Sequence, residues 1–299
     1  MAPSTFVAKI DLKLSEKLKG DLEGMGFSLS SPPYTLFSAQ KKGVSCTLYE
    51  SGKLTVQGKE KDEFITCYLE PEILKSFDYS YPHAYVDRRA RIGIDEAGKG
   101  DFFGPLCIAG VQAGEDKVAE LLDLGVRDSK KMADSVVLAV AKKIRSRFPH
   151  AIVRISPNKY NELYERFKNL NHLLAWGHAT AISDLVSETG CKEVIIDKFA
   201  SEHLVTSAVA KKGLTIHLEQ RVRAEEDVVV AAASIVARAH FLEQLAILGA
   251  EFGMELPKGA ANHVIEAGKA FVAKHGRESL RKVAKLHFKT TDLVLSNHA

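Results

Sequence analysis

Cysteine is scarce in this sequence. Four of the 299 residues are cysteines, and Cys46, Cys67, Cys107 and Cys191 are widely spaced. No C-x-x-C pair is present, which argues against a zinc site or a thioredoxin-like redox motif. Such sparse cysteines also argue against the disulfide scaffold of a small secreted protein, so we expect reduced thiols and a cytoplasmic location.

Long apolar runs and a strong charge of one sign are also lacking. No run approaches the roughly 18 apolar residues of a membrane span, and residues 1–7 do not have the pattern of a signal peptide. We therefore expect a globular protein with no membrane partner. The 41 Lys and Arg nearly balance the 38 Asp and Glu, but residues 258–289 hold eight basic residues against two Glu, a net +6. This local excess fits either a polyanionic partner or a solvated helix face.

Residues 1–75 predict a small α+β domain. A stretch of alternating apolar and polar residues is followed by a helical segment, and then by three short strand-like runs separated by turn residues. This order predicts an antiparallel meander. The predicted strands are 5–13, 34–40, 44–49 and 53–58, and the predicted helix is 15–24.

Residues 76–90 have no clear period and form a predicted linker to a second domain at 91–299. Strands come first as neighbours in this domain and then alternate with helices, which predicts an α/β fold with a mixed sheet flanked by helices. The predicted strands are 91–95, 105–112, 151–156, 193–197 and 214–218, and the predicted helices are 116–123, 130–148, 158–168, 170–189, 201–212, 227–247, 262–275 and 277–285.

The stretch from Gly93 to Lys99 allows two incompatible interpretations. Its spacing, G-x-x-x-x-G-K, is that of a phosphate-binding loop. In such a loop Ser or Thr follows the Lys, but Gly100 stands there, and Asp95 and Glu96 would lie inside the phosphate cradle. Two carboxylates repel a triphosphate unless a cation lies between them. A carboxylate pair at the end of a buried strand is therefore the favoured interpretation.

Other acids in the sequence strengthen that interpretation. A second apolar strand ends at Asp197, and neighbouring parallel strands would bring Asp95 and Asp197 to the same edge of a sheet. A third acidic segment, Glu225, Glu226 and Asp227, comes directly before an Ala-rich helix. Clustered carboxylates suit magnesium or manganese. The acids of the third segment also suit the N-terminus of the following helix, so either role is open for them.

These motifs, taken in order, resemble those of the type 2 ribonucleases H. Residues 93–105, GIDEAGKGDFFGP, are similar to the active-site signature of that family, and the Gly98-Lys99-Gly100 form resembles its ribonuclease HIII branch. The resemblance covers nearly all of residues 91–290. It also includes the D-S-K element at 128–130, N-L-N-H at 169–172, I-I-D at 195–197, and R-A-E at 223–225 followed by AAASIVAR at 231–238.

The resemblance implies a ribonuclease H-like catalytic domain and an N-terminal domain similar to half of the TATA-binding protein. It implies an endoribonuclease that uses Mg²⁺ or Mn²⁺ to cut the RNA strand of RNA/DNA hybrids by a two-metal mechanism, leaving 3′-hydroxyl and 5′-phosphate ends. No small-molecule cofactor is implied, and we expect a monomer. The implied catalytic acids and metal ligands are Asp95, Glu96, Asp197 and Glu225, and the implied substrate-binding residues are Gly98, Lys99, Gly100, Ser129 and Lys130.

Some alternatives stay open at this point. The chain could be a hybrid-binding protein without catalysis. Ser129 could contact substrate or cap the helix predicted at 130–148. Glu226 and Asp227 compete with Glu225 for the place of the fourth acid. His172 and Trp176 are four residues apart on a predicted helix, a spacing that favours packing over acid–base chemistry.

Overall fold

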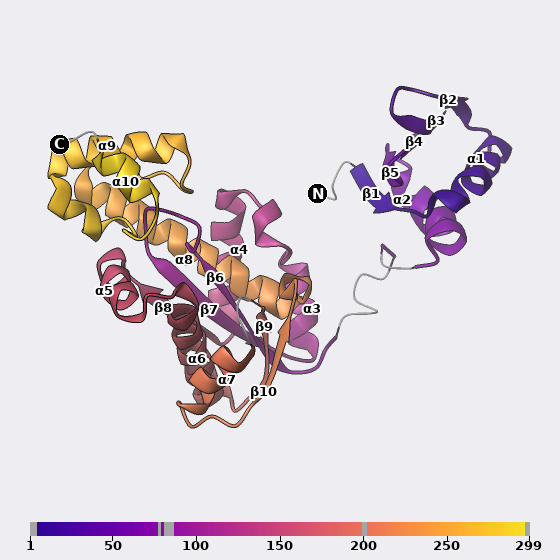
Figure 1. Ribbon diagram of the computed structural model, residues 1–299. Coiled ribbons are helices and arrows are strands. Elements are labelled where there is room, and N and C mark those ends of the chain that lie inside the picture. The colour runs from indigo at the N-terminus through magenta and orange to yellow at the C-terminus, as the bar shows by residue number, and fades with distance from the viewer. Residues whose placement is uncertain (1–4, 77–78, 81–86, 199–201, 297–299) are drawn as a thin grey trace. The chain divides into compact units, whose positions relative to one another are not determined.

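The computed structural model describes residues 5–76, 79–80, 87–198 and 202–296. The chain forms two compact units, Met1–Val86 and Asp87–Ala299 (Figure 1). Most of the linker predicted at 76–90, namely 77–78 and 81–86, lies outside the described residues. Each unit has a core of its own, so the two are described separately.

The first unit is a five-stranded antiparallel sheet with helices. Its strands lie in the order β1-β5-β4-β3-β2, which contains the predicted meander. Three elements were not predicted: a 3-10 helix, Leu12–Leu14, inside the strand predicted at 5–13; β2, which is only three residues long; and a helix over residues 61–74 that widens to a π-helix and contains Pro71. The elements are β1 Thr5–Lys9, α1 Ser15–Gly24, β2 Ser28–Ser30, β3 Thr35–Lys41, β4 Val44–Tyr49, β5 Lys53–Gln57 and α2 Lys61–Phe64, continued by Ile65–Leu74.

The second unit contains the predicted mixed sheet. Its strands lie in the order β10-β9-β6-β7-β8, with β6, β9 and β10 parallel to one another and β7 antiparallel to both of its neighbours. The last strand begins three residues later than predicted, because the apolar residues Leu214 and Ile216 pack on the core before the strand starts. The strands are β6 Arg91–Ala97, β7 Leu106–Ala113, β8 His150–Ile155, β9 Glu193–Asp197 and β10 His217–Arg221.

Helices cover both faces of this sheet. α8 packs on β6 and β7, with α4 beside it, while α6 packs on β7 and β8 (Figure 1). The helices are α3 Asp116–Asp123, α4 Asp134–Arg147, α5 Pro157–Phe167, α6 Leu170–Thr189, α7 Glu202–Ala210, α8 Val228–Phe252, α9 Asn262–His275 and α10 Thr290–Leu295. The helix predicted at 277–285 is a shorter 3-10 helix, Arg277–Lys282, and α10 was not predicted.

Helix α8 is the central helix of the second unit. Among the described residues it is the one helix long and apolar enough to cross a membrane by length and composition. However, 72% of its most apolar window is buried inside the protein. Its apolar residues are thus accounted for by packing on the sheet and on α4.

Close contact between α8 and the sheet depends on Gly93 in β6. A Cβ atom at this position would lie 2.5 Å from the backbone carbon of Val229 and 2.5 Å from the backbone nitrogen of Val230. We therefore expect Gly93→Ala to lower the free energy of unfolding by about 1–3 kcal/mol, the usual cost of overpacking. Urea denaturation would measure the loss. Gly100→Ala is the matched control, because no atom lies within 4 Å of its Cβ position. Equal stability of the two variants would contradict the expectation.

Candidate active site

The three predicted acids meet at one edge of the second sheet. β6 pairs in parallel with β9, and Ile94 is opposite Ile196, so Asp95 and Asp197 follow side by side on the two strands. Asp197 ends β9, whereas β6 continues two residues beyond the predicted end, to Ala97. Together with Glu96, Asp95 and Asp197 line one cavity of about 470 Å³, called here the acid cavity. The sequence-based expectation that parallel strands place Asp95 and Asp197 at one edge is confirmed.

Asp95 and Glu96 are adjacent acids whose pKa values move in opposite directions. Burial, followed by the nearby charge of Glu96, raises the pKa of Asp95 to about 7. Burial alone would also raise the pKa of Glu96, but a hydrogen bond from His178 and the charge of Lys99 lower it below its ordinary value. A second charge on this carboxylate pair is therefore costly unless a cation is near.

His178 is a site residue that the sequence analysis did not single out for such a role. It lies on α6 and is fully buried, and its Nε2 is 3.0 Å from Glu96 Oε2. Because the carboxylate accepts this hydrogen bond, the imidazole fixes the position of one Glu96 oxygen. The two residues are 82 positions apart in the sequence, so no local motif links them.

The loop after β6 carries Lys99 between two glycines with different environments. Gly98 has a φ of +88°, and a Cβ there would lie 2.2 Å from the carbonyl oxygen of Pro105, so only glycine fits. Gly100 has no atom within 4 Å of its Cβ position and faces open space. Lys99 Nζ lies 3.5 Å from Glu96 Oε1. All three residues line the acid cavity.

Residues 98–104, called here the 98–104 loop, are held by the C-terminal part of the chain. The backbone N–H of Phe102 donates to the carbonyl of Gly259 at 2.8 Å, and that of Gly104 donates to Val283 at 2.8 Å. In the other direction, the N–H of Lys285 donates to the carbonyl of Phe102 at 2.9 Å. Residues more than 150 positions away in the sequence thus complete the loop beside the acid cavity.

Lys285 is buried at this junction. Its Nζ donates to the carbonyl oxygens of Gly104 at 2.6 Å and Phe103 at 3.2 Å. Burial lowers the pKa of this amine to about 7, opposed by the charges of Asp101 and Cys107. Between pH 7 and the ordinary lysine pKa of 10.5, the unfolded chain therefore binds a proton that the folded chain does not. Stability contributed by this site rises with pH across that window.

We expect Lys285→Met to remove this pH dependence. Relative to the parent chain, the variant should lose a slope of at most about 1.4 kcal/mol per pH unit between pH 7 and pH 10. Urea midpoints measured across that range would show it, with exposed Lys282→Met as the control. Parallel stability curves for the parent and Lys285→Met would contradict the assigned pKa.

The D-S-K element places Ser129 in the acid cavity. Ser129 is buried, and its Oγ lies 2.8 Å from Oγ of Ser234 on α8. The alternative that Ser129 caps the following helix is wrong, because α4 begins at Asp134 after Ala133, which makes no side-chain cap. Ser129 instead opens a short 3-10 helix capped by Asp128.

Lys130 lines the acid cavity, where its exposed amine can meet an anion. Arg238, on the same face of α8 as Ser234, also lines the cavity and donates to the carbonyl of Ser129 and to Asp134, the latter at 2.7 Å. Like His178, Ser234 and Arg238 belong to the site but were given no role from the sequence. Both lie in the AAASIVAR segment, where their spacing of four residues places them on one face of a helix.

The acids of the third acidic segment have different surroundings: Asp227 is bound within the fold, whereas Glu225 lies near the acid cavity. Asp227 caps α8 by accepting from the N–H groups of Val229 and Val230, and it pairs with buried Arg91 at 2.8 Å. Asp227 is thus engaged in holding the fold. Glu225 pairs with Lys130 at 3.6 Å, which links it to the acid cavity, although it lines a neighbouring cavity together with Glu226. Glu225 therefore remains the favoured fourth acid.

The donor chemistry of the acid cavity fits a hard divalent cation. Carboxylate oxygens are the ligands that Mg²⁺ and Mn²⁺ use. Burial and the charge of Glu96 raise the pKa of Asp95, so a cation beside Asp95 would stabilise its ionised form. Among the described residues, however, no group of three or more Asp, Glu, His or Cys is placed so that it could hold a metal ion.

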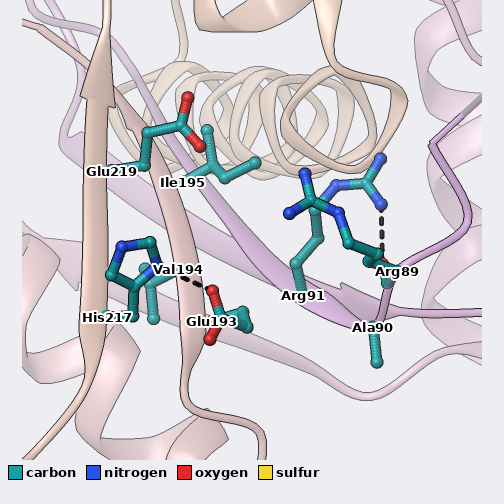
Figure 2. A pocket seen from close by; sticks show the side chains of 8 residues that line it. All are labelled: Arg89, Ala90, Arg91, Glu193, Val194, Ile195, His217 and Glu219. Atoms are coloured by element: carbon teal, nitrogen blue, oxygen red, sulfur yellow. Dashed lines mark hydrogen bonds and ion pairs between the residues drawn. The ribbon is translucent and has the colours of Figure 1, made fainter.

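Another cavity, of about 500 Å³, lies at the opposite end of the same strands (Figure 2). It includes Glu193, the first residue of β9, whereas the acid cavity includes Asp197, the last. Its charges are paired within the protein: His217 contacts Glu193 at 2.7 Å, and Arg91 contacts Asp227 (Figure 2 shows the first pair). This cavity is therefore separate from the acid cavity and shares no lining residue with it.

Comparison with known proteins decides the family. The family model described as Ribonuclease HII matches residues 92–291. A Ribonuclease HIII from Protochlamydia amoebophila is 53% identical, with 97% of this chain and 96% of the relative covered. The chain belongs to the ribonuclease HIII family. A Ribonuclease HIII from Chlamydia trachomatis serovar L2 is 46% identical over 99% of both chains. The resemblance stated from the sequence is confirmed.

Solved ribonuclease HIII structures confirm the α/β fold. The crystal structure of Bst-RNase HIII in complex with Mn²⁺ has a TM-score of 0.69 and 29% identity, covering 98% of this chain and 99% of that one. Aquifex aeolicus RNase H3 has a TM-score of 0.57 and 28% identity. The first unit matches a family described as Domain of unknown function (DUF3378) over residues 5–78. As a ribonuclease HIII, the chain is a metal-dependent endoribonuclease of the ribonuclease H type.

Proposed function

We propose that this enzyme hydrolyses the RNA strand of RNA/DNA hybrids and leaves 3′-hydroxyl and 5′-phosphate ends. The observation that carries the proposal is the acid cavity, where Asp95, Glu96 and Asp197 lie beside the Gly98-Lys99-Gly100 backbone. Acids and an exposed backbone turn in one cavity can bind cations and a sugar–phosphate chain together. The ribonuclease HIII relatives support this assignment.

Asp95, Glu96, Asp197 and Glu225 would hold two divalent cations, Mg²⁺ or Mn²⁺. A pair of such cations activates water and stabilises the attacking and leaving oxygens of a phosphodiester. The related Bst-RNase HIII was crystallised with Mn²⁺, which supports the choice of metals. Within this chain, His178 orients Glu96, and the N–H of Ala224 donates to Asp197 Oδ1 at 3.2 Å, so two of the acids are positioned before any ligand binds.

The 98–104 loop and the D-S-K element would bind the substrate. Gly98 and Gly100 allow the backbone to approach the 2′-hydroxyl groups, which distinguish RNA from DNA. Lys99 and Lys130 would contact phosphates, and buried Ser129 would set the shape of the cavity wall. We expect the near-neutral first unit, which we take to resemble half of the TATA-binding protein, to contact the hybrid through its sheet. We further propose a cytoplasmic monomer.

A cleavage assay tests the proposal directly. Labelled uniform RNA/DNA hybrid, incubated with the full chain and either Mg²⁺ or Mn²⁺, should be cut in the RNA strand, and the products should carry the proposed ends. Duplex DNA and a sample with chelator should stay intact. Binding of the hybrid without cleavage under either metal would instead establish the alternative, a non-catalytic hybrid-binding protein.

Single ribonucleotides within duplex DNA provide a second substrate to compare. We expect weak cleavage there, because the Gly98-Lys99-Gly100 form and the additional N-terminal unit both follow the ribonuclease HIII branch. Parallel assays on a uniform hybrid and on a duplex with one ribonucleotide would measure the preference. Strong incision 5′ of the lone ribonucleotide would overturn this expectation.

A further inference from the structure

A further cavity of the catalytic unit lies between α6 and α7, away from the acid cavity. It has a volume of about 420 Å³ and shares no lining residue with the acid cavity. We call it the Trp176 pocket. Its apolar floor is formed by Phe167, Ala175, Ala179, Leu204 and Ala208, and its other lining residues are His172, Trp176, His203, Ser207, Lys211 and Lys212.

Trp176 is exposed in this pocket rather than packed in the core. Of the two residues for which the sequence favours packing, His172 stacks on Phe167 with ring centroids 6.4 Å apart although it is exposed, whereas the Trp176 side chain is 42% accessible. Trp176 is also the single tryptophan of the chain. An indole that faces solvent across an apolar floor offers a flat surface on which another ring can stack.

The positive charge of the pocket favours an aromatic ligand that carries a negative charge. Lys211 and Lys212 lie at its edge, and none of its lining residues is Asp or Glu. An aromatic face next to two ammonium groups is complementary to a base with its phosphate attached, because the base stacks and the phosphate meets the lysines. A neutral aromatic ligand would make no ionic contact with the two lysines.

The position of the pocket on α6 limits which nucleotide can enter. His178, two residues after Trp176, contacts Glu96 in the acid cavity. Two residues correspond to a rotation of about 200° around a helix that is about 10 Å wide. The pocket therefore lies across the helix from the catalytic acids. The nucleotide being cut cannot occupy it, but a nucleotide from a single strand that leaves the duplex can.

We propose that the Trp176 pocket binds an unpaired nucleotide of a single-stranded tail next to the hybrid, with its base on Trp176 and its phosphate at Lys211 and Lys212. This inference rests on the proposed function only in taking a nucleic acid as the substrate. It adds a site that favours hybrids with single-stranded extensions over blunt ones.

The single tryptophan makes the test direct. The full chain is titrated, in the presence of chelator, with a blunt RNA/DNA hybrid and with the same hybrid carrying a single-stranded thymidine tail of about six nucleotides. We expect the tail to quench Trp176 fluorescence and to tighten binding about tenfold, as stacking of one base can do. No quenching and equal affinities would overturn the proposal, and an apolar segment of a partner protein as the true occupant would give that result.

Variants separate the pocket from general electrostatic attraction. Trp176→Leu, and Lys211→Glu combined with Lys212→Glu, should lose the preference for the tailed hybrid in an anisotropy assay, while binding and cleavage of the blunt hybrid stay within about twofold. Lys142→Glu combined with Lys143→Glu, exposed on α4, is the charge-matched control and should keep the preference. If the control loses it equally, the pocket is not the site. Failure of blunt-hybrid cleavage by the parent chain would instead count against the proposed function.

Discussion

Asp95→Asn and Asp197→Asn are each expected to reduce cleavage of the RNA/DNA hybrid by at least about 1,000-fold, as the loss of an essential catalytic group does. Asp95 lies two residues before the end of β6, Asp197 ends the neighbouring parallel strand β9, and both line the same cavity. The amide keeps the shape of the side chain but removes the negative charge that a divalent cation needs. Rates under single-turnover conditions with Mg²⁺ and Mn²⁺ would measure the effect.

Hybrid binding separates a catalytic defect from a folding defect. Because the lysines and the 98–104 loop are untouched, both variants should bind the hybrid within a few-fold of the parent chain in the presence of chelator. The melting temperature of Asp95→Asn should not fall, since Asn at this position removes a charge that is buried beside Glu96. Asp184→Asn, exposed on α6, is the matched control with unchanged activity. Cleavage at the parental rate by Asp95→Asn would refute the catalytic role.

His178→Leu should lower cleavage by up to about 100-fold, the range seen when a residue that orients a metal ligand is lost. The leucine leaves one Glu96 oxygen without the hydrogen bond that the imidazole donates at 3.0 Å. His178→Gln, which can still donate, should recover part of the activity. The defect should lie in kcat and in the affinity for Mn²⁺ measured by calorimetry, while KM for the hybrid changes little.

Another histidine–glutamate pair serves as the control for His178. His217 contacts Glu193 at 2.7 Å, but both side chains are mostly exposed, and they begin β10 and β9, at the end of these strands away from Asp197. Exposed pairs contribute little, so His217→Leu should leave cleavage unchanged within about twofold. If His178→Leu binds Mn²⁺ as the parent chain does and only melts at a lower temperature, His178 serves the fold alone.

The acids could be predicted because their signals are local. Asp95 and Asp197 each end a short apolar run, and apolar runs of this length are strands. Parallel pairing of the two strands then places both acids at one edge. The same logic gave the mixed sheet and most of its helices, because the apolar period of each segment is set by the face that it buries.

Other features escaped because their causes are distant in sequence. His178 reaches Glu96 only through the packing of α6 on the sheet, and its neighbour Trp176 faces outward because α7 meets α6 without covering it. The sequence alone allows Asp227 to be a catalytic acid, because its partner Arg91 lies 136 residues earlier in the chain. Residue types and their spacing along the sequence do not predict contacts between residues that are so far apart in the chain.

The hydrogen bonds between the 98–104 loop and residues 259–285 have a consequence for synthesis of the protein. Asp95, Glu96 and the loop leave the ribosome well before Gly259, Val283 and Lys285, which hold the loop. Because domains generally fold as units during synthesis, the second unit completes its 98–104 loop only after these later residues have been added. Nuclease activity should therefore begin only once residue 285 has left the ribosome.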